Sequence, residues 1–117
     1  MVTDSHSHSL RLKKSMANYI KVTVLRGNEG NICGFHILNH GNPIVCSAVS
    51  ALSFNTVNSI EELTQARFSV DMDENGGDMK FQVIDYNDTD ASLLLKSLLL
   101  GLKAIELDYK DDIRIFD

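Results

Sequence analysis

The sequence predicts an α+β domain, a two-layer sandwich in which two helices cover one face of a mixed sheet. Three observations carry this prediction. Two segment pairs alternate apolar and polar residues, a long apolar helical pattern follows each pair, and every expected strand has one apolar face. The chain has 117 residues, which suits a single domain, and 44% of them are hydrophobic, as in globular proteins.

Residues 1–15 show no periodicity. We interpret them as a flexible leader, a cloning remnant or a segment upstream of the true start, and assign residues 16–117 to the domain.

The first segment pair predicts a hairpin. Residues 19–26 alternate as a half-buried strand does. Residues 28–30 have turn chemistry and residues 31–37 resume the extended pattern, which completes the hairpin.

The period changes after a loop at residues 39–43. Apolar residues at helical spacing over residues 44–65 predict a largely buried helix. Asn42 suits its N-cap, because the side-chain oxygen can accept a hydrogen bond from a free N–H group. Pro43 suits the first helical position, where no N–H is needed.

The second half repeats this order. Residues 68–73 and 79–83 alternate on either side of a turn at residues 75–77, which predicts a second hairpin. Leucine-rich residues 91–107 predict the second helix, capped by Thr89 or Asp90.

A short final strand follows, about Ile113 and Ile115. With two helices available to cover strands that each have one apolar face, the order of elements gives the two-layer architecture.

Charge and cysteine content restrict the partners. The net charge of −5 disfavours direct binding to nucleic acid and favours a basic partner. Residues 93–107, the longest near-apolar run, are too few and too polar to span a bilayer, so no membrane association is expected. No segment has the pattern of a secretory signal, so we expect Cys33 and Cys46 to be reduced in a cytoplasmic protein.

Cys46 is the candidate nucleophile. A helix that begins at Pro43 places it in or just past the first turn, where the helix dipole and unpaired N–H groups favour a thiolate. Asn42, Pro43 and Val45 form this helix start, and its free backbone N–H groups, that of Cys46 included, would hold an oxyanion. His36 at the end of the preceding strand, or His40 in the loop, could act as general base and acid.

Two other interpretations of these residues stay open. Free cysteines are often buried, so Cys46 could be a structural residue of an apolar helix, as we expect Cys33 to be. Cys33, His36, His40 and Cys46 have ligand types that suit zinc, but their spacing matches no common zinc motif. We therefore expect no resident metal and no cofactor.

Longer motifs carry a family resemblance. Residues 40–52 have the sequence His-Gly-Asn-Pro-Ile-Val-Cys-Ser-Ala-Val-Ser-Ala-Leu, residues 55–61 continue it, and residues 100–105 are Leu-Gly-Leu-Lys-Ala-Ile. On these motifs, the chain from Met16 onward resembles Prp, the bacterial family of ribosomal-processing cysteine proteases. The resemblance implies a homodimeric Cys–His protease with Cys46 as its nucleophile. Its substrate would be the extended N-terminus of large-subunit ribosomal protein number twenty-seven.

The chain departs from the family pattern before the cysteine. The family histidine directly follows a glycine, whereas here Phe35 separates Gly34 from His36, and the family usually has aspartate where this chain has Pro43. The resemblance assigns the base to His36, with His40 as the alternative. It leaves a second function open, a catalytically impaired module of the same fold that binds a basic ribosomal protein.

Overall fold

The computed structural model describes residues 19–39, 41–73, 78–85 and 87–117. Along these described residues the elements follow in the order β1 (Ile20–Arg26), β2 (Ile32–Leu38), α2 (Pro43–Leu63), β3 (Phe68–Met72), β4 (Met79–Val83), α3 (Thr89–Asp108) and β5 (Ile113–Phe116). The leader expected at residues 1–15 and the turn expected at residues 75–77 lie outside the described residues.

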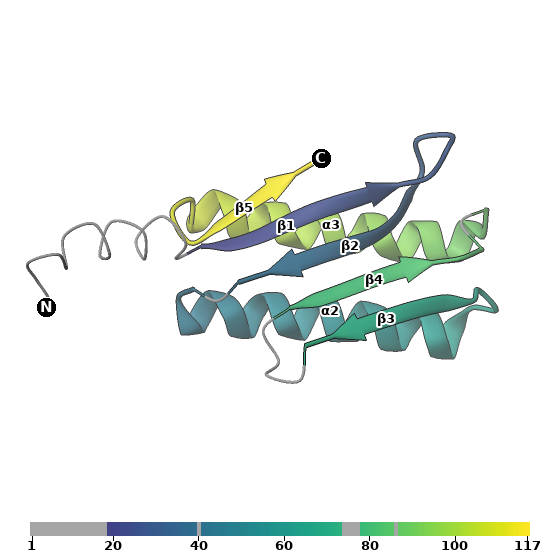
Figure 1. The fold of residues 1–117 in the computed structure, drawn as a ribbon, viewed down its shortest axis with the longest axis horizontal. Helices are drawn as coiled ribbons and strands as arrows, with labels where there is room; N and C mark the ends of the chain where they lie inside the picture. The colour runs from purple at the N-terminus through teal and green to yellow at the C-terminus, as the bar shows by residue number, and fades with distance from the viewer. Residues whose placement is uncertain (1–18, 40, 74–77, 86) are drawn as a thin grey trace, which may run out of the picture.

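The strands form one mixed sheet in the order β3-β4-β2-β1-β5. Both hairpins are antiparallel, β2 joins them by pairing with β4, and β5 runs parallel to β1. Both helices lie against the same face of the sheet (Figure 1). The prediction of a two-layer α+β domain is confirmed.

Strand register decides which side chains meet the helices. Phe35 in β2 lies opposite Val24 of β1 and Phe81 of β4, and all three are buried. Directly opposed residues share a face and successive residues alternate between faces. The neighbouring row formed by Thr23, His36 and Lys80 therefore lies on the face away from the helices.

The helix starts follow from local capping. The Oδ1 atom of Asn42 accepts a hydrogen bond from the Ile44 N–H at 2.9 Å and Pro43 opens α2, as predicted. The prediction for the second helix was wrong, since neither Thr89 nor Asp90 is the cap. Asp88 caps α3 because its carboxylate accepts from the Ala91 N–H at 2.9 Å, so the helix begins earlier than expected.

The open end of the β3–β4 hairpin is closed by Arg67 and Asp85. Arg67 Nη2 lies 2.7 Å from Asp85 Oδ1, and the Ile84 N–H donates to the Arg67 carbonyl oxygen at 2.7 Å. Hydrogen bonds from the Arg67 side chain lower the pKa of Asp85 to about 2. An exposed ion pair adds little to stability, so we interpret the role of this pair as fixing the geometry of the hairpin.

By length and composition alone, α2 could cross a membrane. The fold accounts for its apolar character in another way. Val45, Val49 and Ile60 belong to the hydrophobic core that α2 shares with the sheet and with α3. Core helices pass the same test, so this finding is weak evidence for a membrane span.

Candidate active site

The connection between β2 and α2 positions Cys46. After β2 ends at Leu38, Asn39 takes a left-handed backbone conformation with φ 73°, which turns the chain toward α2. Asparagine is among the few non-glycine residues that adopt this region readily. Cys46 is then the fourth residue of α2, and its thiol is free and half-buried.

The loop backbone approaches the sulfur. The Gly41 N–H donates to Cys46 Sγ at 3.4 Å, across five residues of the chain. The Gly41 backbone and the start of α2 therefore meet at the Cys46 thiol.

The expectation that the Cys46 N–H would hold an oxyanion was wrong. This group donates to the Asn42 carbonyl oxygen at 2.8 Å, because the fourth helical residue is the first whose N–H finds a carbonyl four positions earlier. The Ile44 N–H is taken by the Asn42 side chain, and Pro43 has no N–H. Among the described residues, the Val45 N–H has no acceptor, so it stays the candidate donor at this helix start.

A hydrogen bond from the second hairpin fixes the loop. Asp78, which precedes β4, accepts the Asn39 N–H on Oδ1 at 2.9 Å, although the two residues are 39 positions apart. The bond fixes Asn39 and thereby the direction in which the chain leaves β2. No sequence pattern indicated it, since only the folded sheet brings these two residues together.

The structure separates one predicted site residue from the sulfur. The His36 side chain is on the sheet face away from the helices, whereas Cys46 lies on a helix packed against the other face. His40 lies outside the described residues. Cys33 is buried, 4% exposed, as expected. Within the described part of the chain, no three His, Cys, Asp or Glu side chains form a possible metal site.

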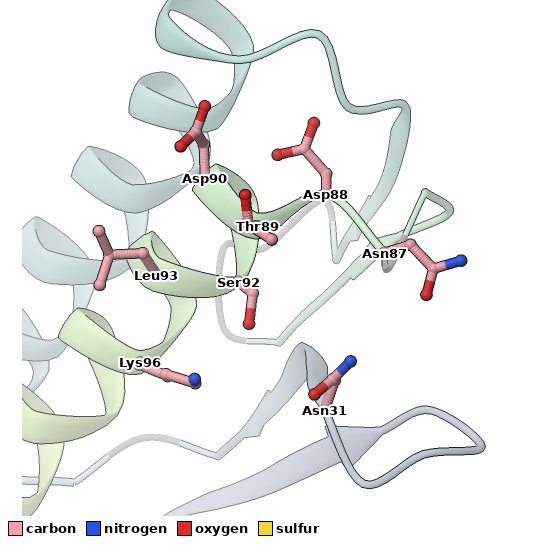
Figure 2. Close-up of a pocket in the computed structure, with 8 residues that line it drawn as sticks. All are labelled: Asn31, Asn87, Asp88, Thr89, Asp90, Ser92, Leu93 and Lys96. Atoms are coloured by element: carbon pink, nitrogen blue, oxygen red, sulfur yellow. The ribbon is translucent and has the colours of Figure 1, made fainter.

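A hollow on the described surface lies where α3 begins (Figure 2), at the end of the domain opposite the start of α2 (Figure 1). Asn31, from the end of the first hairpin loop, faces the first turns of α3 across it. Figure 2 shows that the lining side chains do not converge, since Leu93 and Asn87 point away from each other. We therefore assign the candidate site to the helix start at Cys46.

A free, half-buried thiol in the first turns of a helix, with a backbone N–H against its sulfur, defines a candidate cysteine-dependent enzyme. Comparison with known proteins gives the same class. The model of the family described as cysteine protease Prp matches residues 19–114. The chain belongs to the Prp family.

Individual relatives agree with this assignment. The ribosomal processing cysteine protease Prp of Staphylococcus aureus strain Mu50 is 33% identical over 102 residues, which is 82% of this chain and 96% of that protein. The Bacillus subtilis Prp is 30% identical over 106 residues, covering 82% and 95%. Both relatives are cysteine proteases by name, which supports protease activity in this chain.

Solved structures share the fold. The crystal structure of S. aureus Prp with a covalently linked product peptide has a TM-score of 0.79 and 34% identity, covering 83% of this chain and 97% of that chain. A Streptococcus mutans crystal structure has a TM-score of 0.77 and 29% identity, covering 87% and 96%. The architecture around Cys46 is thus the architecture of this family.

Proposed function

We propose that this protein is a cytoplasmic cysteine protease that removes the N-terminal extension of large-subunit ribosomal protein number twenty-seven. The observation that carries the proposal is the free, half-buried thiol of Cys46 at the start of α2, whose sulfur accepts a hydrogen bond from the Gly41 N–H. S. aureus Prp, a relative with this fold, has been solved with a substrate peptide. The net charge of −5 suits a basic ribosomal protein and disfavours direct contact with nucleic acid.

The chemistry needs a thiolate and one imidazole. The imidazole takes the thiol proton, Cys46 Sγ attacks the scissile carbonyl carbon, and the negative charge passes to the carbonyl oxygen beside the helix start. When the tetrahedral intermediate collapses, the C–N bond breaks and the imidazolium gives its proton to the leaving amine. Water then attacks the thioester, loses a proton to the imidazole, and releases the new carboxylate and the thiol.

We assign the imidazole to His40 rather than His36. Asn39 precedes His40 and has a left-handed backbone conformation that glycine also adopts, so we match Asn39-His40, in place of Gly34-Phe35-His36, with the Gly-His pair of the family. Gly41, which follows His40 directly, has its N–H against the Cys46 sulfur. His36 faces the other side of the sheet.

Replacing each histidine separately tests this assignment. His40→Ala is expected to lower kcat/KM for the extended ribosomal protein by about 10²- to 10⁴-fold, the usual contribution of a general base. His36→Ala is expected to keep most of the activity, because its side chain cannot reach the sulfur from the opposite sheet face. Cleavage is followed by mass spectrometry of the shortened product. A large loss in His36→Ala with an active His40→Ala protein would reverse the assignment.

The homodimer that the family resemblance implies has a candidate surface on α3. Leu93, Leu100 and Leu107 are 65%, 72% and 71% exposed and recur every seven residues, which places them on one stripe of the helix. A regular stripe of exposed leucines is typical of a surface that another chain covers. We assign the dimer contact to this stripe.

Leu100→Glu is expected to convert the dimer to a monomer in light scattering coupled to gel filtration. A carboxylate in the centre of the stripe would have to be buried without a partner, which opposes association. Gln82→Glu adds the same charge on an exposed position of β4 and serves as the matched control. A Leu100→Glu protein that keeps the mass of the wild type would place the contact elsewhere.

The second candidate function is a catalytically impaired binding module. The segment before Cys46 favours it, because Phe35 separates Gly34 from His36 where the family has a direct Gly-His pair. In that case the chain binds the ribosomal protein without cutting it. Wild type and Cys46→Ala would then bind equally and neither would release product, whereas the protease proposal requires that the wild type releases product and Cys46→Ala does not.

A further inference from the structure

A small cavity opens on the side of α2 that carries Cys46. Its apolar walls come from α2, from β2 and from the second hairpin, and are formed by Ile37, Val49, Phe54, Met72 and Met79. Its polar lining groups are Ser50, Ser53 and Asp78. The cavity has a volume of about 40 Å³, which admits the tip of one side chain and excludes a larger ligand.

The cavity lies within reach of the scissile bond. Val49, Ser50 and Ser53 follow Cys46 by three, four and seven residues, so all four residues share one face of the helix. At a rise of about 1.5 Å per residue, Ser53 is about 10 Å along the helix axis from Cys46. An extended peptide advances about 3.3 Å per residue, so a residue within about three positions of the scissile bond reaches the cavity.

Ser53 has a hydroxyl group that needs a partner. The residue is 1% exposed, and its Oγ has no hydrogen-bond partner among the described residues. Thr56, on the same helix, satisfies its hydroxyl by donating to the Leu52 carbonyl oxygen at 2.9 Å. A buried hydroxyl without a partner is costly, so whatever fills the cavity gains by bonding to it.

We propose, on the basis of the proposed protease function, that this cavity binds one substrate side chain that is apolar along its length and ends in a hydrogen-bonding group without negative charge. Ser53 is then the specificity-determining residue. The apolar walls disfavour an acidic tip, because burying an unpaired charge is unfavourable. Asp78 lines the same cavity while it accepts the Asn39 N–H, so its carboxylate adds repulsion against acidic side chains.

The test profiles a peptide library by mass spectrometry, with matched pairs that differ only at the side-chain tip: Tyr and Phe, Thr and Val, Gln and Met. At one subsite, the wild type is expected to cleave the polar-tipped peptides at least about fivefold faster than their isosteres. Ser53→Ala is expected to lose this preference at that subsite alone. Ser97→Ala, an exposed serine on α3, is the matched control and keeps it.

Equal cleavage of both members of every pair by the wild type would overturn the proposal, as would a preference that survives in Ser53→Ala. Thermal melting first verifies that each variant is folded. If the wild type cuts no peptide, the protease proposal fails and the cavity is tested by binding instead. Fluorescence anisotropy with the Cys46→Ala protein should then show tighter binding of the polar-tipped peptides, lost in Cys46→Ala/Ser53→Ala, and equal affinities would refute the assignment.

Discussion

Cys46→Ala is expected to abolish cleavage of the extended ribosomal protein, with a loss of about 10⁴-fold or more in kcat/KM. In the proposed mechanism the sulfur forms the covalent bond to substrate, and an alanine methyl group cannot form that bond. Substrate binding should change little, because alanine keeps the helix start and its cap. The measurement combines product formation by mass spectrometry with substrate affinity by anisotropy.

The chain contains its own control for this experiment. Cys33→Ala also removes a thiol, but from a buried position in β2, so it should lower stability by about 1 kcal/mol and leave cleavage intact. Iodoacetamide should modify the native protein at the half-buried Cys46 and spare Cys33. Equal cleavage by wild type and Cys46→Ala would remove the nucleophile assignment altogether.

Much of the fold follows from patterns that lie within single elements. Alternation with period two predicts the strands, and the helical repeat together with Asn42 and Pro43 predicts the start of α2. The cap of α3 was predicted wrongly because Asp88, Thr89 and Asp90 are all good cap residues in adjacent positions. Only the geometry shows which carboxylate reaches the Ala91 N–H.

The site is harder to predict because it depends on contacts between elements. Cys46 could be found from its place after the cap, which is a local property. The bond from the Asn39 N–H to Asp78 depends on the packing of the second hairpin against β2. The orientation of His36 depends on register, since a shift of one residue would move it to the helix-covered face.

Gly34→Ala is expected to destabilise the domain by about 3 kcal/mol or more, and to lower the melting temperature by about 10 °C or more. Gly34 lies opposite Gln82 in the centre of the sheet. A Cβ atom there would overlap the Phe81 carbonyl oxygen and lie 2.9 Å from the Gln82 Cα. Both contacts are with backbone, so neither can be relieved by rotating a side chain.

Gly30→Ala separates this steric effect from backbone strain. Gly30 has φ +83° and nothing within 4 Å of an added Cβ, so alanine there should cost only about 1 to 2 kcal/mol of conformational strain. A Gly34→Ala protein no less stable than Gly30→Ala in urea denaturation would show that β2 and β4 can move apart. The expected larger loss would instead mean that the close packing of β2 against β4 requires glycine at position 34.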